Sequence, residues 1–297
     1  MATMMASEKA PGKVAGNSRK HCLLYGLQPV KSKRKTEQRG KVMTRRTFAL
    51  ILIVFCGALV ALALPGHREP RAPGDVAQLN VTIQEWPVPS KGGHPHDPAV
   101  GNDGSLWFTE QMVNKLGRLD PQTGKIELKE VPTESALPYG IQINSKGVPI
   151  FCELGTHKMG SIDPKTLAIK EYALPEEVRP RRLAIAADDT VYFTDFKSGH
   201  LGSLNTTTGA VKLFPSPGGA ESNPYGIAIT PDGMVWYSES GVHPNTIIRF
   251  NPTTQSFARA NIPSGGGVVR NMAATRDGRV YIACSGVDKV GIVSPVK

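Results

Sequence analysis

Short runs in which apolar and polar residues alternate recur along residues 79–297 of the chain. Five of these runs share one pattern: LWFTE (106–110), PIFCE (149–153), VYFTD (191–195), VWYSE (235–239) and VYIAC (280–284). Their last residues are separated by 43, 42, 44 and 45 residues. Alternation with a period of two predicts β-strands, and a near-constant spacing of this size predicts a repeated supersecondary unit.

Each five-residue run, called the phrase below, is surrounded by the same predicted elements in every repeat. A strand after a proline-containing turn comes first, as in NPYGIAIT (223–230), and the turn PDG (231–233) joins it to the phrase. A third strand ends in a polar turn, as in KLGRLDPQTG (115–124), and a fourth ends on proline, as in IELKEVP (126–132). Four short antiparallel strands per repeat are typical of a propeller blade. We therefore expect an all-β fold, a β-propeller of four-stranded blades with five repeats.

The two ends of the repeated region are complementary. The last repeat stops after a third strand, KVGIVSP (289–295), and the region opens on an isolated fourth strand, IQEWPVP (83–89). Pairing of these two segments would complete the last blade and close the ring, which would remove exposed sheet edges. The sequence therefore predicts a closed propeller domain over residues 79–297, and an open array of the same repeats is the alternative.

The positive charge of the chain is concentrated before the repeats. The chain has 297 residues, 35 Lys and Arg and 25 Asp and Glu, with a formal net charge of +10. Residues 1–46 hold twelve of the basic and two of the acidic side chains, which leaves 23 of each in the remaining 251 residues. Because a domain without excess cations cannot hold a polyanion, we do not expect it to bind nucleic acid.

A basic segment and an apolar segment precede the repeats. We interpret residues 1–42 as a basic, disordered tail, and residues 43–66 carry two arginines before an apolar run (49–64). This order, with Ala61-Leu62-Ala63 as a cleavage site, predicts a signal peptide, and an uncleaved signal anchor is the alternative. The domain is then extracytoplasmic, either periplasmic or secreted, and it meets a membrane only through an uncleaved anchor.

Two cysteines, Cys152 and Cys284, lie within the repeats. They occupy different strand positions in different repeats, so a disulfide between them would require a coincidence of geometry. Although export would permit a bridge, two cysteines do not make a disulfide scaffold. We interpret both as ordinary small residues of buried strands.

The hairpin geometry predicts two sets of polar residues at one end of the propeller. In an antiparallel hairpin, the start of the first strand lies beside the end of the second. The first set follows the proline position of each repeat: His96, Tyr139, Arg181, Tyr225 and Arg270. The second set ends each phrase and is expected to lie opposite the first: Glu110, Glu153, Asp195, Glu239 and Cys284. We expect both sets to face the mouth of the central channel.

These two sets support different interpretations. A carboxylate that recurs in successive repeats most simply accepts hydrogen bonds from the next turn, and Arg181 could neutralise Asp195. Histidines add a chemical signal, because a His titrates near neutral pH and binds metals. All five histidines of the repeats map to this rim: His94, His96, His157, His200 and His243. His96 is the first candidate for a functional role.

Several phrases of the repeats resemble the streptogramin B lyase family, the propellers typified by virginiamycin B lyase. They are LWFTEQMVNKLGRLDPQTGKI (106–126), LPYGI (137–141), NPYGIAITPDGMVWYSE (223–239) and GGGVVRNMAATRDG (265–278). The resemblance covers essentially all of residues 83–297. It implies an exported carbon–oxygen lyase that opens an ester of a cyclic depsipeptide or related compound by β-elimination. In that family a His removes the proton α to a carbonyl, and Mg²⁺ held by acidic groups stabilises the resulting charge.

The resemblance also implies roles for individual residues. The phrase Pro95-His96-Asp97 matches the family's histidine phrase, so His96 is the candidate catalytic base. Tyr139 and Tyr225 match a substrate-contacting Tyr in the family's Pro-Tyr-Gly-Ile phrase. Independently of the resemblance, the rim residues Arg181, Arg270 and His94 are further candidates for binding a small-molecule or peptide-like substrate at the mouth. Three residues are candidates for a Mg²⁺ site: Glu110, Glu153 and Glu239. The protein is expected to act as a monomer.

Some features depart from the family, and two other functions stay open. The family enzymes have seven blades, and His94 stands where they have an acid two residues before the catalytic His. A gluconolactonase-type hydrolase is one alternative, although Tyr225 stands where those enzymes have a calcium-binding Asn. The other is a non-enzymatic extracytoplasmic propeller that binds a protein or a glycan at its rim, which the fold itself permits.

Overall fold

The computed structural model describes residues 81–295, which lie in the compact unit Leu79–Lys297. Besides strands, it contains two short 3-10 helices, η1 (Gln111–Val113) and η2 (Ala220–Ser222). The predicted tail (1–42) and signal segment (43–66) lie outside the described residues. Within residues 81–295, no helix is long and apolar enough to span a bilayer.

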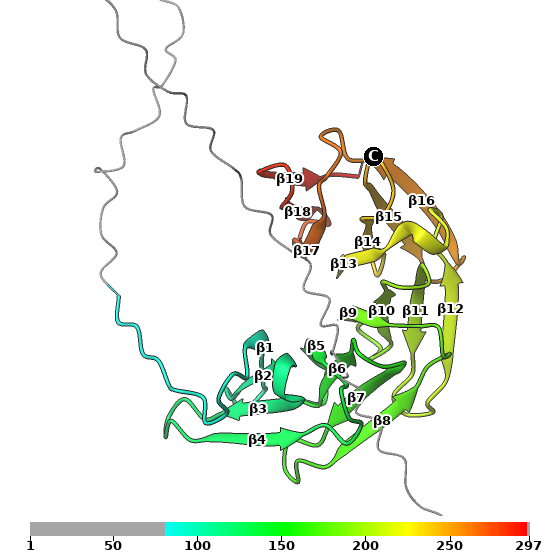
Figure 1. Ribbon diagram of the computed structural model, residues 1–297. Coiled ribbons are helices and arrows are strands. Elements are labelled where there is room, and N and C mark those ends of the chain that lie inside the picture. The colour runs from blue at the N-terminus through cyan, green and yellow to red at the C-terminus, as the bar shows by residue number, and fades with distance from the viewer. Residues whose placement is uncertain (1–80, 296–297) are drawn as a thin grey trace, which may run out of the picture. The chain divides into compact units, whose positions relative to one another are not determined.

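The strands form five antiparallel sheets, each built from consecutive hairpins and referred to below as blades 1 to 5 (Figure 1). Blades 1 and 2 contain β1 (Pro95–Val100), β2 (Leu106–Glu110), β3 (Lys115–Leu119), β4 (Ile126–Glu130), β5 (Pro138–Ile143), β6 (Pro149–Glu153), β7 (Lys158–Ile162) and β8 (Ile169–Ala173). Blades 3 to 5 contain β9 (Pro180–Ile185), β10 (Val191–Asp195), β11 (His200–Leu204), β12 (Val211–Pro215), β13 (Pro224–Ile229), β14 (Val235–Glu239), β15 (Thr246–Asn251), β16 (Ser256–Asn261), β17 (Val269–Ala274), β18 (Val280–Cys284) and β19 (Lys289–Val293). The predicted all-β propeller with five repeats is confirmed.

Adjacent blades pack through their sheet faces, and the core therefore lies between them. The first strands contact one another in succession, β1 with β5, β5 with β9, β9 with β13 and β13 with β17. One apolar cluster joins Trp236 and Ile247 of blade 4 to Val269, Met272 and Ile282 of blade 5. Alternating strands bury one face against each neighbour, which explains why the second strands of blades 2 to 4 are buried along their whole length.

A repeated pair of residues explains part of the sequence pattern. Phe108 of β2 lies opposite Gly117 of β3, and Phe151 and Phe193 face Gly160 and Gly202 in the same register. A Cβ added at Gly117 would lie 2.1 Å from the Phe108 ring, so the aromatic ring occupies the space of the missing side chain. The recurring glycine in the third strand is therefore required by close packing.

The two cysteines of the described region are free and buried, as expected. Cys152 packs in the cluster between blades 2 and 3, and Cys284 packs in the cluster between blades 4 and 5. Burial raises the pKa of both thiols. Both act as small apolar residues of the core.

The predicted closure of the ring is wrong. Blade 5 has three strands, β17 to β19, and residues 81–88 form no strand. Residues 84–86 and Val88 instead line a pocket of about 390 Å³ with Leu106, Phe108 and Leu119 of blade 1. Trp86 and Val88 thus find apolar partners on the open face of blade 1, and the edge of β19 is left unpaired within the described residues.

Candidate functional site

The first residues of the inner strands gather at one end of a central channel. The channel is a cavity of about 230 Å³ lined by residues from β1, β5, β9, β13 and β17. Its lining includes Asp97, Gly140, Arg182 and Asn271, and each directly follows one residue of the predicted first set. His96, Tyr139, Arg181 and Arg270 therefore lie at the channel mouth, and Tyr225 joins them through its hydrogen bond with Tyr139.

Side chains from blades 1 to 4 contact one another at this mouth. The hydroxyl groups of Tyr139 and Tyr225 are 2.9 Å apart and hydrogen-bonded. The His96 ring lies against the Tyr139 ring, with centroids 4.2 Å apart. The Arg181 guanidinium carbon lies 4.1 Å from the centroid of the Tyr225 ring and 4.2 Å from that of Phe196. Four of the sequence-predicted residues are thus brought together.

His96 has a carboxylate partner that the sequence analysis did not single out. Its Nδ1 lies 2.8 Å from Oδ1 of Asp97, and the other oxygen of Asp97 pairs with the Arg182 guanidinium of blade 3. The sequence does contain a signal for this ion pair. The position after the mouth residue is glycine in blades 2 and 4, namely Gly140 and Gly226, but it is charged in blades 1 and 3.

The two mouth tyrosines have opposite pKa shifts. Burial and the hydrogen bond with Tyr225 raise the pKa of Tyr139. Burial alone would raise the pKa of Tyr225 too, but the hydrogen bond from Tyr139 and the charge of Arg181 lower it. Tyr139 is therefore the hydrogen-bond donor of the pair when Tyr225 loses its proton.

The pairing partners of the second set differ from the expected ones by one residue. The last residues of the phrases lie opposite Pro95, Pro138, Pro180, Pro224 and Val269, and an irregularity follows in each hairpin. The carboxylates among them, Glu110, Glu153, Asp195 and Glu239, are fully buried. The expectation that both sets face the mouth is therefore wrong for the second set, because the irregularity turns the following residue toward the channel.

The buried carboxylates are bound by their own loops. Glu239 accepts hydrogen bonds from Ser216 Oγ at 2.6 Å, from Thr246 Oγ1 at 2.5 Å and from the Gly218 backbone amide at 2.6 Å. Glu110 accepts one from Ser90 Oγ at 2.6 Å. Glu153 accepts one from Thr156 Oγ1 at 2.9 Å, and burial raises its pKa to about 7. These contacts match the scaffold interpretation of the recurring acids.

The salt bridge that Arg181 could have formed with Asp195 is not present among the described residues. Asp195 accepts hydrogen bonds from the Arg179 backbone amide at 3.0 Å and from Ser198, and it lies 3.1 Å from His200 Nδ1. These partners belong to the flanking loop, so the carboxylate is satisfied without a guanidinium. Arg181 stacks on aromatic rings instead.

The residues at the mouth do not fit a bound Mg²⁺. Mg²⁺ prefers several oxygen ligands in an octahedral arrangement. Among residues 81–295, no group of three or more His, Cys, Asp or Glu side chains is placed to hold a metal ion. Glu110, Glu153 and Glu239 lie in separate blades, and the guanidinium groups of the mouth would repel a cation. We therefore derive no step through a metal.

The histidines of the repeats do not form one cluster. His96 lies at the mouth, whereas His200 binds Asp195 beside it in the same blade. His94 and His243 are exposed, and His157 is half-buried on the loop before β7. His94 has a φ of 50°, a left-handed conformation that turns the chain into β1. Only the assignment of His96 gains geometric support within the described residues.

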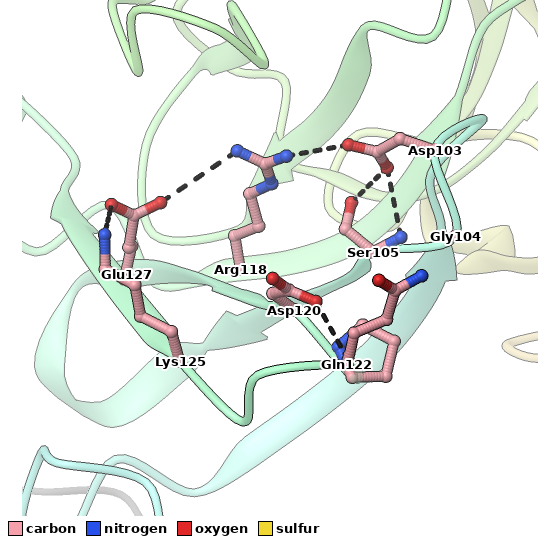
Figure 2. A pocket seen from close by; sticks show the side chains of 9 residues that line it. Asp103, Gly104, Ser105, Arg118, Asp120, Gln122, Lys125 and Glu127 are labelled. Atoms are coloured by element: carbon pink, nitrogen blue, oxygen red, sulfur yellow. Dashed lines mark hydrogen bonds and ion pairs between the residues drawn. The ribbon is translucent and has the colours of Figure 1, made fainter.

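A second charged pocket, of about 350 Å³, lies at the end of blade 1 away from the mouth (Figure 2). In it the Arg118 guanidinium lies 2.7 Å from Asp103 and 3.9 Å from Glu127, and Lys125 also pairs with Glu127. Blade 4 repeats the arrangement, because Arg249 pairs with Asp232 and both arginines stack on a Trp of the second strand. The repetition and the mutual neutralisation indicate a structural role for this pocket.

Comparisons with known proteins agree with this architecture. A family model described as the virginiamycin B lyase family matches residues 74–215. The solved structure of selenomethionine-substituted virginiamycin B lyase from Staphylococcus aureus is 26% identical, with a TM-score of 0.68 over 73% of this chain and 72% of that chain. A catalytically inactive variant of that enzyme, solved with quinupristin, is 27% identical with the same TM-score and coverage.

More distant structures share the fold alone. A putative gluconolactonase is 16% identical, with a TM-score of 0.52 over 68% of this chain and 74% of that chain. No curated protein sequence matches the chain. The family match, the lyase structures and the blade architecture agree, and the part of the chain that the structure describes is a β-propeller similar to virginiamycin B lyase.

Proposed function

We propose that the channel mouth catalyses β-elimination at an ester of a cyclic depsipeptide or related compound, with His96 as the base. The hydrogen bond between His96 Nδ1 and Asp97 carries this proposal. A carboxylate can only accept hydrogen bonds, so Nδ1 bears the proton and Nε2 keeps a free electron pair. Asp97 also stabilises the imidazolium that forms when Nε2 takes a proton.

The reaction needs no water and conserves mass. His96 Nε2 takes the proton α to a carbonyl, the electron pair forms a carbon–carbon double bond, and the ester C–O bond breaks to release a carboxylate. Tyr139 contacts the His96 ring, and its hydrogen-bonded pair with Tyr225 leaves one hydroxyl proton to donate to the substrate carbonyl. Arg181, above both tyrosines, and Arg270 supply positive charge where the enolate develops.

The first experiment exposes the full-length protein to quinupristin, the compound present in the related lyase structure. Mass spectrometry with chromatography separates the outcomes, because elimination yields a linear product of unchanged mass and hydrolysis adds one water. Parallel samples with Mg²⁺ and with a chelator test the metal expectation. We expect a linear product of unchanged mass in both samples.

Single substitutions then test the base. His96→Ala should lower kcat by at least about a hundredfold, since a positioned base contributes roughly that much. His243→Ala is the matched control, because His243 is exposed in the loop between β14 and β15 and is not one of the mouth residues named above. Turnover by His96→Ala at the rate of the unsubstituted protein would reject His96 as the base, and intact quinupristin would reject the antibiotic as a substrate.

A non-enzymatic binding propeller is the second candidate function. It is favoured by the burial of the recurring carboxylates, which leaves aromatic and guanidinium groups at the mouth. Such a mouth binds a ligand without needing a metal. Saturable binding of quinupristin with no product would favour this candidate over the lyase. A product heavier by one water would favour a lactonase-like hydrolase.

We also propose that the domain acts outside the cytoplasm as a monomer, in the periplasm or after secretion. The support is the sequence of residues 43–66, with its arginines and apolar run. Fractionation of cells that express the full chain tests this location. Recovery of the protein in the cytoplasmic fraction would contradict it, and light scattering of the purified protein measures the oligomeric state.

A further inference from the structure

Arg181 carries a positive charge that no carboxylate neutralises among the described residues. Its guanidinium carbon lies 4.1 Å from the centroid of the Tyr225 ring, 4.2 Å from that of Phe196 and 5.2 Å from that of Tyr139. Asp195, the carboxylate that could have paired with it, is bound by its own loop. The aromatic rings hold the guanidinium by cation–π attraction and leave its charge uncompensated.

The neighbouring arginines differ from Arg181 in their partners. Arg182 points into the channel and pairs with Asp97. Arg270 is exposed, and its Nε donates a long hydrogen bond, 3.3 Å, to Ser285 Oγ. Three guanidinium groups and one mouth carboxylate therefore leave the mouth positively charged. This charge is consistent with the lowered pKa of Tyr225.

The stacked position leaves hydrogen-bond donors of Arg181 free. The guanidinium has five N–H donors, and its hydrogen bond to the Tyr225 side chain occupies only part of them. The Arg181 Nε is buried and has no hydrogen-bond partner within the described residues. A planar fork of this kind matches a carboxylate, which accepts two parallel hydrogen bonds from it.

We propose that Arg181, assisted by Arg270, binds a carboxylate group of the ligand that occupies the propeller mouth. The ligand class is then an organic acid with an apolar group that packs on Phe196 and Tyr139. A further consequence rests on the proposed function: breaking the ester C–O bond releases a carboxylate, and Arg181 binds this group as its charge develops. The guanidinium thus stabilises the developing charge at a site whose residues do not fit a metal.

The test measures binding directly, so that it does not depend on turnover. Full-length protein is titrated with benzoate and with benzamide, which has the same shape without the charge, and binding is followed by calorimetry or ligand-observed NMR. We expect benzoate to bind and benzamide to bind at least about tenfold more weakly, because the charge-assisted bidentate pair is lost. Binding of both probes with equal affinity, or no benzoate binding, would overturn the proposal.

Two substitutions assign the site. Arg181→Gln should weaken benzoate binding at least about tenfold, and Arg181→Lys should weaken it less, because a lysine keeps the charge without the planar fork. Arg276→Gln is the control with the same change in net charge, since Arg276 is exposed in the turn between β17 and β18, away from the mouth. Circular dichroism verifies folding, and the Lys variant provides the test if the Gln variant does not fold.

The outcomes for this site and for the lyase are separable. Benzoate binding that depends on Arg181 supports the carboxylate site whether or not quinupristin is cleaved. Arg181→Gln with benzoate affinity equal to that of the unsubstituted protein would overturn the site and leave an observed elimination intact.

Discussion

Blades 4 and 5 present equivalent faces to very different surroundings. Trp236 and Ile247 on the outer face of blade 4 are 7% and 4% exposed, because blade 5 packs over them. Tyr281 and Val290 occupy the same positions on β18 and β19, and they are 50% and 86% exposed. Figure 1 shows β17–β19 at the end of the series of blades, with β13–β16 as their neighbour.

The difference shows that the burial of a blade's apolar face depends on the neighbouring blade as much as on the blade's own sequence. Each blade offers an apolar face to the next one, and the burial of that face depends on whether a next blade is present. The free energy gained from such a face is roughly proportional to the apolar area that the neighbour covers. Equivalent residues in the two blades should therefore contribute unequally to stability.

The largest difference is expected for the aromatic residue of the second strand. Trp236→Ala should destabilise the domain by about 3–5 kcal/mol, because it leaves a cavity between two packed blades. Tyr281→Ala should cost less than about 1 kcal/mol, as for a surface substitution. Chemical denaturation of the two variants measures both values. Equal losses would show that the face of blade 5 is covered in solution.

The last residue of the phrase provides the next comparison. Glu239→Gln should cost about 2–3 kcal/mol, because the hydrogen bonds from Ser216, Gly218 and Thr246 lose their charged acceptor. Cys284→Ala removes only one buried sulfur atom and should cost about 1 kcal/mol. Thermal unfolding at neutral pH compares the two variants, and a larger loss for Cys284→Ala would contradict this order.

Glu153, at the same position in blade 2, should make stability depend on pH. Burial raises its pKa to about 7 in the folded state, above its ordinary value of 4.5, so the folded state binds the proton more tightly. The stabilising contribution of protonated Glu153 to the free energy of unfolding is fully present below pH 4.5. About 1–3 kcal/mol of it is lost as the pH rises through 7. Glu153→Gln should abolish this part of the decline in denaturation midpoints between pH 4.5 and pH 8. An unchanged decline would exclude Glu153 as its source.

The smallest effect is expected on the exposed face itself. Val290→Lys should change the free energy of unfolding by less than about 0.5 kcal/mol, because the side chain lies in water. The equivalent Ile247→Lys would bury an unpaired charge between blades 4 and 5 and serves as the contrasting variant. A loss above about 1 kcal/mol for Val290→Lys would show that another surface covers blade 5.

Much of this architecture was predictable from sequence because it depends on local pattern. The alternation within LWFTE and its relatives, the turns between them and their spacing specify hairpins and blades without reference to distant residues. The pairing of Phe108 with Gly117, repeated in blades 2 and 3, links neighbouring strands within one blade. Local patterning also identified the residues that start each inner strand.

The sequence predicted which residues lie at the candidate site, but it did not predict which side chains contact one another there. The sequence placed His96, Tyr139, Arg181, Tyr225 and Arg270 at one mouth, but it did not reveal the aromatic partners of Arg181. Asp195 is satisfied by its own loop, and the irregularity after each proline position turns the mouth residues away from the buried carboxylates. The pairing of Asp97 with Arg182 joins residues 85 positions apart.

The sequence by itself therefore determined the blades, their order and the residues available at the mouth, because these depend on short-range periodicity and turn chemistry. Only the tertiary structure decided that residues 84–86 and Val88 line a pocket on blade 1 and that Arg181 stacks on aromatic rings. Both outcomes depend on competition between distant surfaces for the same side chain. Such competition is settled by the area buried and the hydrogen bonds satisfied when the blades assemble.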